Sequence, residues 1–308
     1  DLTADHRRQT TEPVVCGPSS VVFSSSLADA LTHGPFDAAI FALKSFDTAA
    51  ALEGMKPHLD RMPPVLCLSN GVDNEPDLEA LLGPERVLAG TLTSAVGRVA
   101  AGEIVLERLR GAGVAAGPEN EELAGRLVAA LEAAGLNARL YPSAADMKWS
   151  KMLTNLPANA TAAILDLTAA EVFAHPGLFA LEMRMMREAL AVMKAHGIHV
   201  VDLPGTPVRL LALGVRLPAA VSRPLLAKAV GGGRGGKMPS FHIDLHSGRG
   251  RSEVGWLNGA VVRFGEKAGV PTPVNRLLTE TLSALTRGEV PLATYSRQPE
   301  RLLSLTAK

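Results

Sequence analysis

The pattern of apolar residues changes once along the chain, and this change constrains the fold more than any other feature. From about residue 20 to residue 141, short apolar runs alternate with helical patterns; the first runs are VVFSS (21–25), AAIFAL (38–43) and VLCLS (65–69). Continuous apolar runs such as AAIFAL are typical of strands buried on both faces of a parallel sheet. Their alternation with helices predicts an α/β structure with helices on the faces of the sheet.

After Leu88 the runs become shorter and are separated by glycines. The segments TLTSAVGRV, EIVLERL and GVAAG predict short strands, followed by a helix over 119–134 and a last strand over 137–141. Beyond Pro142 the strand pattern disappears. We expect helices over 146–165, 178–196, 252–268 and 273–286. Pro157 should bend the first of them or mark a local irregularity, and glycines at 197 and 269 should end the next two.

These patterns predict two domains, which suits a length of 308 residues. Residues 1–142 are expected to form a Rossmann-like, doubly wound dinucleotide-binding domain. Residues 143–308 are expected to form an all-helical substrate-binding and catalytic domain.

Composition excludes several classes of protein. The 31 Lys and Arg balance the 31 Asp and Glu, so no net charge favours nucleic acid or an anionic membrane. No apolar run approaches the roughly 18 residues of a membrane span, and the polar start lacks the apolar core of a signal peptide. Cys16 and Cys67, the two cysteines, support neither a disulfide framework nor a zinc site. We therefore expect a reduced, cytoplasmic protein that binds no nucleic acid and no membrane.

Two segments resemble known ligand-binding motifs, but each lacks a residue that its motif requires. GGGRGGKM (231–238) nearly matches a phosphate-binding P-loop, yet Met238 stands where a hydroxyl must bind magnesium and Pro239 follows at once. His242 and His246 have the spacing of helical zinc ligands, but Asp244 replaces the required Glu at the wrong position. The sequence therefore predicts no nucleoside triphosphate site and no metal site.

A row of polar residues in the first helix after Pro142 is more informative. Lys151, Asn155 and Asn159 follow at i, i+4 and i+8, so each is displaced only about 40° from the last around a helix. Two interpretations remain open, a solvated helix face or a site. Asparagine is a poor helix former, and one Lys with two Asn suits a site that holds a carboxylate or hydroxy acid and supplies a proton.

A second group of polar residues lies further along the chain. Ser240 and Asp244 are one helical turn apart, and Glu253 opens the next helix after Ser252, a plausible N-cap. Glu253 is either a functional acid or simply stabilised by the helix dipole.

Lys44 and Asn70 follow two predicted strands. Ligands of doubly wound folds bind at the carboxyl ends of the strands, which makes both residues candidates. The alternative for Asn70 is a turn, because Asn-Gly is a common turn dipeptide.

Taken in order, these segments resemble the ketopantoate reductase (2-dehydropantoate 2-reductase) family, a relative of 6-phosphogluconate dehydrogenase. The segments that carry the resemblance are FALKSFD around Lys44, LSNGVDN around Asn70, GTLTSA (90–95), KWSKMLTNLPAN (148–159), MPSFHID (238–244) and RSEVGWLNGAVVRFGEKAGVPTPVN (251–275).

The resemblance implies an enzyme of pantothenate biosynthesis that reduces 2-dehydropantoate to pantoate with NADPH, in a cleft between two domains. By resemblance, Lys151 is the general acid, and Glu253 orients it and touches the cofactor ribose. The substrate-binding residues would be Asn155, Asn159, Ser240 and Asp244. The cofactor contacts on the first domain would be Lys44, Asn70 and the backbone at Ala95.

The chain departs from the family pattern at three places. The spacing from Asp244 to Glu253 is one residue longer than expected. Ala160 follows Asn159 where the family has Asn-Pro, and Ala169 falls near a further substrate-binding Asn of the family. A reductase of another 2-oxo acid with the same architecture therefore remains an alternative.

The third departure is the lack of a Gly-x-Gly-x-x-Gly sequence near the start. We expect that the first βαβ element, roughly 30 residues, is missing from this chain, together with the residue that chooses NADPH over NADH. A non-catalytic binding or regulatory paralogue is the remaining alternative. The last predicted helix is compatible with a homodimer but does not require one.

Overall fold

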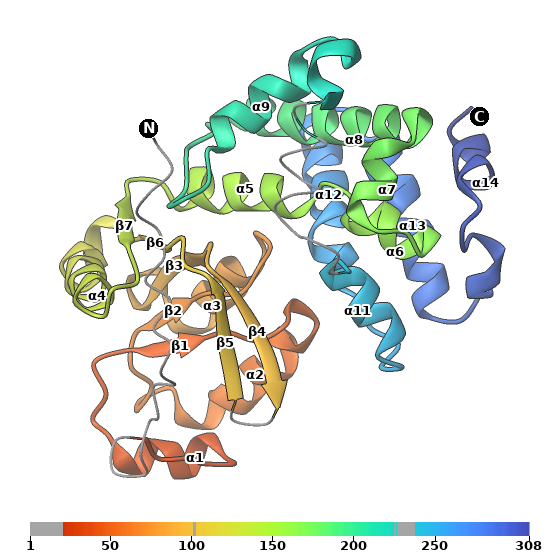
Figure 1. The fold of residues 1–308 in the computed structure, drawn as a ribbon. Helices are drawn as coiled ribbons and strands as arrows, with labels where there is room; N and C mark the ends of the chain where they lie inside the picture. The colour runs from red at the N-terminus through yellow and green to blue at the C-terminus, as the bar shows by residue number, and fades with distance from the viewer. Residues whose placement is uncertain (1–20, 101–102, 225, 227–237, 308) are drawn as a thin grey trace.

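Five short strands form the central sheet in the computed structural model of the chain, which describes residues 21–100, 103–224, 226 and 238–307. In spatial order the strands are β1 (Ala39–Phe41), β2 (Val65–Cys67), β3 (Val87–Leu92), β6 (Ala112–Ala115) and β7 (Ala138–Tyr141). The first three strands are parallel, as predicted. β6 pairs antiparallel with β3 and parallel with β7, so the complete sheet is mixed. β4 (Ala95–Ala100) and β5 (Glu103–Arg108) form a separate antiparallel hairpin that projects from the sheet (Figure 1).

Helices cover both faces of the sheet, which confirms the doubly wound fold class. α2 (Thr48–Met55) and α3 (Asn74–Leu82) pack on one face, in a core that contains Val65 and Cys67 of β2. α4 (Glu121–Ala133) packs on the other face, in a core that contains Leu66. Successive side chains of a strand point to opposite faces, so one apolar strand contributes to both cores.

Short helical segments complete this part of the chain. They are α1 (Leu27–Ala30), η1 (Leu31–His33), η2 (Ser45–Asp47), η3 (Lys56–His58), η4 (Pro84–Arg86) and η5 (Pro118–Asn120), where η denotes a 3₁₀ helix.

The prediction of a strand over 21–25 is wrong. These residues have no strand structure, and Phe23 is 91% exposed, so no core buries their apolar surface. The strand predicted over 38–43 forms as β1, but it is not buried on both faces because Ile40 is 61% exposed. β1 is the edge strand of the sheet in the part of the chain that the structure describes. The helices therefore cover the face that carries Ile40 only in part.

Helices replace strands after β7, as the sequence predicts; outside the named strands the described residues show one isolated bridge, between Leu203 and Thr206. The helices are α5 (Ala144–Asn155), α6 (Asn159–Leu165), α7 (Ala169–Ala174), α8 (Pro176–Ala195), α9 (Val208–Arg216), α11 (Ser240–His246), η6 (Glu253–Trp256), α12 (Asn258–Ala268), α13 (Pro273–Thr286), η7 (Leu292–Thr294), α14 (Pro299–Ser304) and η8 (Leu305–Ala307). The helix predicted over 273–286 has the predicted bounds, and Gly197 follows α8 with a φ of +67°. Among the described residues, no helix is both long and apolar enough to cross a membrane.

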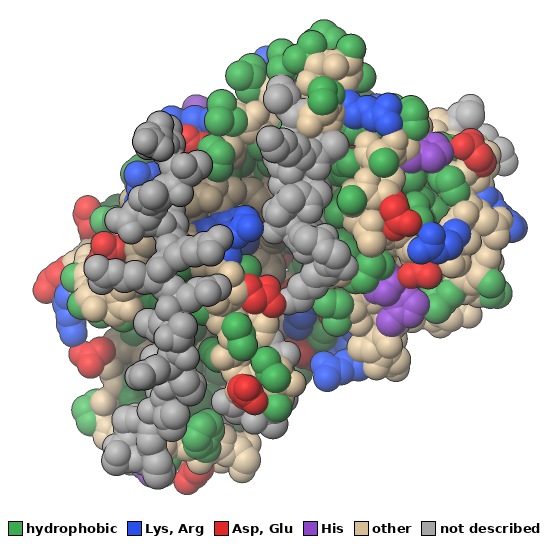
Figure 2. All heavy atoms as spheres, in the orientation of Figure 1, with side chains coloured by type: hydrophobic (Ala, Val, Ile, Leu, Met, Phe, Trp, Pro, Cys, Tyr) green, Lys and Arg blue, Asp and Glu red, His purple; other side chains and the backbone are tan. Residues whose placement is uncertain are grey.

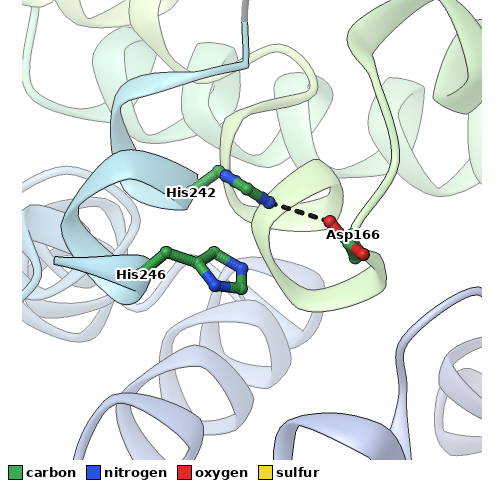
Figure 3. Close-up of side chains that lie close together, drawn as sticks. All are labelled: Asp166, His242 and His246. Carbon is green, nitrogen blue, oxygen red and sulfur yellow. Dashed lines mark hydrogen bonds and ion pairs between the residues drawn. The ribbon is translucent and has the colours of Figure 1, made fainter. Parts of the chain in front are cut away.

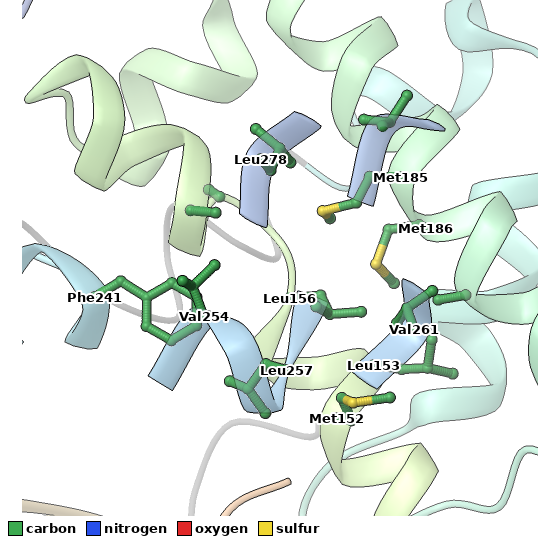
Figure 4. Close-up of a cluster of buried hydrophobic side chains, with 14 of the residues drawn as sticks. Met152, Leu153, Leu156, Met185, Met186, Phe241, Val254, Leu257, Val261 and Leu278 are labelled. Atoms are coloured by element: carbon green, nitrogen blue, oxygen red, sulfur yellow. The ribbon is translucent and has the colours of Figure 1, made fainter. Parts of the chain in front are cut away.

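The helical part has a large apolar core to which α5, α8, α11, α12 and α13 all contribute (Figure 4). Met152, Met185, Phe241 and Leu278 are among its buried side chains. The same core includes Ala89, from β3, so it is continuous with the sheet.

Three predicted features have no structural test. Cys16 and nearly all of GGGRGGKM lie outside the described residues, and the expectation that the first βαβ element is missing stays a prediction.

The helix predicted over 146–165 is two helices, broken after Asn155. Pro157 has no N–H to donate, and Ala158 adopts a left-handed conformation with a φ of +53°. Buried Glu182 of α8 accepts a hydrogen bond from the Ala158 N–H at 2.8 Å and one from Thr161 Oγ1 at 2.5 Å. The expectation that Asn155 and Asn159 share one helix is therefore wrong, because Asn159 opens α6.

Candidate active site

The carboxyl ends of β1 and β2 lie at the same edge of the sheet, because these strands are parallel. Lys44 follows β1 and Asn70 follows β2, so the predicted neighbourhood of these two residues is confirmed. Ser45 Oγ donates a hydrogen bond to the Asn70 carbonyl at 3.0 Å and joins the two segments. The edge thus presents an ammonium group and a side-chain amide close together.

Two carboxylates from the helical part meet at Lys44. Its Nζ lies 2.7 Å from Glu253 Oε2 and 3.2 Å from Asp244 Oδ2. The other oxygen of Glu253 accepts a hydrogen bond from the Ser45 N–H at 3.2 Å. It also lies 3.3 Å from Ser45 Oγ, whose one proton can be donated either to this carboxylate or to the Asn70 carbonyl. Glu253 is only 2% exposed, and Ser252 caps its 3₁₀ helix as predicted. Segments about 200 residues apart therefore assemble one charged cluster.

The electrostatics of this cluster favour a charged Lys44. Burial by itself would lower the pKa of Lys44, but the charges and hydrogen bonds of Glu253 and Asp244 raise it above its ordinary value. Burial, together with repulsion by Glu253, raises the pKa of Asp244 in spite of the attraction to Lys44. Asp244 is therefore protonated more easily than an ordinary aspartate.

The two asparagines of the predicted row join the sheet edge to the helices. Asn155 Nδ2 donates a hydrogen bond to Asn70 Oδ1 at 3.2 Å. Asn159, 2% exposed, accepts one from the Phe241 N–H at 3.1 Å and donates one to Ser240 Oγ at 3.3 Å. The amide groups therefore connect a residue expected to bind cofactor with residues expected to bind substrate.

Lys151 and Ala95 lie on two different elements. Lys151 is half-buried on α5, one helical turn before Asn155. The carboxylate oxygens of Glu253 contact Lys44 and Ser45, and the expectation that Glu253 orients Lys151 stays a prediction. Ala95 opens β4, three residues after the end of β3, and pairs with Arg108, so its expected contact with the cofactor also stays a prediction.

A buried ion pair that the sequence did not predict lies beside the site. Lys148 of α5 is 5% exposed, and its Nζ lies 2.7 Å from Oε1 of Glu75 on α3. The same ammonium donates hydrogen bonds to the carbonyls of Ser69 and Gly90, at 2.6 and 3.2 Å. Its three-residue spacing from Lys151 was visible in the sequence, but nothing local distinguishes a buried lysine from a solvated one.

A cation and an amide at the carboxyl ends of parallel strands, faced by a helix with Lys and Asn, define a class of protein. In open α/β sheets this edge is where ligands bind, and the facing helices supply a second set of polar groups. The arrangement is that of an α/β ligand-binding fold whose binding edge is faced by helices.

Comparison with known proteins agrees with this class. Residues 5–117 match the family model "Ketopantoate reductase PanE/ApbA", and residues 144–286 match "Ketopantoate reductase PanE/ApbA C terminal". The chain belongs to the ketopantoate reductase family, whose members are oxidoreductases that act on a 2-oxo acid.

Individual relatives are distant. The 2-dehydropantoate 2-reductase of Halobacterium salinarum is 29% identical over 285 residues, which are 90% of this chain and 81% of that protein. The crystal structure of a PanE/ApbA family ketopantoate reductase from Ralstonia eutropha has a TM-score of 0.68 at 25% identity, covering 85% of this chain and 80% of that one. A ternary structure of D-mandelate dehydrogenase with NADH and anilino(oxo)acetate has the same TM-score at 23% identity, covering 83% and 77%. That last likeness concerns the fold alone.

Proposed function

We propose that the protein reduces 2-dehydropantoate to pantoate with NADPH. The observation that carries the proposal is the hydrogen bond from Asn155 to Asn70. It joins a residue expected to bind the substrate to a residue expected to bind the cofactor, and the reaction requires both ligands side by side. Family membership and the relatives named 2-dehydropantoate 2-reductase support the choice of substrate.

The donors and acceptors at the strand edge fit a nicotinamide dinucleotide. Lys44 and Asn70 offer an ammonium and an amide to phosphate or ribose oxygens, and the Glu253 carboxylate can accept a hydrogen bond from a ribose hydroxyl. The dinucleotide would supply a hydride to the 2-oxo carbon. Residues 1–142 would form the dinucleotide-binding domain, and residues 143–308 would form the substrate-binding domain.

The residues of the helical part would hold the 2-oxo acid and supply the proton. Lys151 donates a proton to the 2-oxo oxygen, where negative charge develops during reduction. Ser240 and the two asparagines offer hydroxyl and amide hydrogen-bond groups to the carboxylate and hydroxyl of the substrate. Asp244 and Glu253 hold the Lys44 cation between the residues expected to bind the cofactor and those expected to bind the substrate.

Lys151→Ala tests the role of the general acid. We expect turnover of 2-dehydropantoate, followed by NADPH absorbance, to fall on the order of 100-fold or more, with binding of NADPH retained. Lys267→Ala, which removes a lysine from the last turn of α12, is the matched control and should keep full turnover. Turnover unchanged in Lys151→Ala would refute the assignment.

A second substrate class follows from the sequence departures at Ala160 and Ala169. Ala160 stands where the family has a proline, and Ala169 lies near the position of a substrate-binding asparagine of the family. Reduction of a second 2-oxo acid, phenylglyoxylate, should therefore be compared with reduction of 2-dehydropantoate, each with NADPH and with NADH. A higher kcat/KM for phenylglyoxylate would favour the alternative, and binding of NADPH without turnover of either acid would favour a non-catalytic paralogue.

A homodimer stays a prediction of the sequence. Sedimentation of the complete chain measures it directly.

A further inference from the structure

Three potential metal ligands meet where the end of α6 approaches α11. Asp166 caps α6, and His242 and His246 lie one helical turn apart on α11. One ligand atom from each residue lies within 4.8 Å of the others. The side chains converge from both elements in Figure 3, and histidine side chains gather at the surface over α11 in Figure 2.

This cluster is separate from the candidate active site, although α11 contributes to both. Ser240 and Asp244 face Asn159 and Lys44, as their hydrogen bonds show. A step of two residues rotates a side chain by about 200° around a helix, so His242 and His246 point to the opposite side. The proposed reaction uses neither histidine.

The contacts already bring the ligand atoms near metal-binding distances. His242 Nε2 lies 2.9 Å from Asp166 Oδ1, and the two imidazole rings lie 4.1 Å apart between centroids. Ligand atoms of a tetrahedral zinc ion, bound at roughly 2.0–2.2 Å, lie about 3.4 Å from one another. A shift of about 1.5 Å or less would therefore close the site, and the exposed His246 side chain can change rotamer to make it.

The donor groups of the cluster suit a cation. Asp166 offers a carboxylate, and each histidine offers a ring nitrogen that binds a metal in its neutral form. Arg297, the guanidinium of which pairs with Glu171 at 3.3 Å, is a positive charge near the cluster. Two imidazoles and a carboxylate form a borderline donor set, which suits Zn²⁺ better than Ca²⁺ or Mg²⁺.

We propose that Asp166, His242 and His246 bind one Zn²⁺ ion, with a fourth coordination position open to solvent. The ion would fasten α11 to the end of α6, the two elements that begin with Ser240 and Asn159. The sequence predicts no such site because it shows only two ligands at helical spacing; the third lies 76 residues from His242.

Calorimetric titration of the untagged, complete chain with ZnCl₂ tests the proposal. We expect one equivalent bound, with the affinity at least 10-fold weaker in His242→Ala, His246→Ala and Asp166→Asn. Asparagine tolerates the left-handed backbone conformation of Asp166, so this variant removes the charge and keeps the turn. Co²⁺ in place of Zn²⁺ should give the visible absorption of a tetrahedral site, and these bands should disappear in the same variants.

His199→Ala is the matched control. His199 is exposed and has its Nδ1 3.7 Å from a carboxylate oxygen of Asp146, which gives it one acidic neighbour like that of His242. Zinc binding should be unchanged in this variant. The proposal is overturned if the complete chain binds no zinc, if His199→Ala weakens binding as much as His242→Ala, or if Asp166→Asn binds zinc as tightly as the parent protein.

Discussion

At the scale of single residues, Lys44 is the cation on which the charged cluster depends. Lys44→Met would leave the buried Glu253 carboxylate without a counter-ion. Lys44 is itself 40% exposed, so we expect a loss of about 1–3 kcal/mol in unfolding free energy, less than for a fully buried pair. Urea unfolding at neutral pH measures this loss of unfolding free energy. Lys44→Arg, which keeps the charge, should lose less, and equal losses would contradict the ion-pair explanation.

The pH dependence of this contribution follows from the direction of the shift. The pKa of Lys44 is raised in the folded protein, so the stabilisation is fully present below the ordinary lysine value of 10.5. It should be lost as the pH rises through the higher pKa of the folded state. The difference in unfolding free energy between the parent protein and Lys44→Met should therefore shrink only in strongly alkaline solution.

Cys67 gives a second residue-scale prediction. Burial, first, and the nearby Glu75 carboxylate raise the pKa of its thiol to about 12, so the reactive thiolate is scarce at pH 8. In a Cys16→Ser variant, Ellman's reagent should react with Cys67 far more slowly in the folded protein than in urea. Rapid reaction of the folded variant would contradict this burial. Stability should also fall between pH 9 and 12, where the unfolded thiol ionises and the folded thiol does not.

At the scale of elements, Glu182 holds the break between α5 and α6. Glu182→Ala would leave the Ala158 N–H and the Thr161 hydroxyl buried without their acceptor. We expect a loss of about 2–5 kcal/mol in unfolding free energy, measured with guanidinium chloride. Glu182→Gln keeps an acceptor oxygen and the packing, so its loss should be clearly smaller. If both variants lost the same free energy, the charge rather than the hydrogen bonds would hold the break.

The same break shows how far the sequence predicts an element. Pro157 marked an irregularity correctly, because a proline cannot donate the helical hydrogen bond. The sequence could not show that the chain ends one helix there and begins another, because the group that satisfies the break, Glu182, comes from α8. The strand expected over 21–25 failed for a related reason, since apolar residues form a strand only where a core is present to bury them.

At the scale of the whole molecule, Lys148 fastens the helical part to the sheet. Lys148→Met would leave Glu75 buried without its partner and release the carbonyls of Ser69 and Gly90. We expect a loss of about 3–5 kcal/mol in unfolding free energy, measured by urea unfolding. The double variant Lys148→Met/Glu75→Gln removes both charges and should be more stable than Lys148→Met alone. A double variant with the summed loss of the two single variants would show that the pair does not interact.

The sequence by itself determined the change from an α/β part to a helical part, the C-terminal end of α8, both ends of α13, and the polar residues that follow β1 and β2. These features depend on apolar periodicity, glycine and proline, which act between near neighbours in the chain. Only the tertiary structure decided that Glu253 pairs with Lys44, that Lys148 is buried against Glu75, and that Asp166 lies beside His242 and His246. Each of these contacts links segments between 73 and 209 residues apart, and local periodicity does not encode which distant charge a side chain meets.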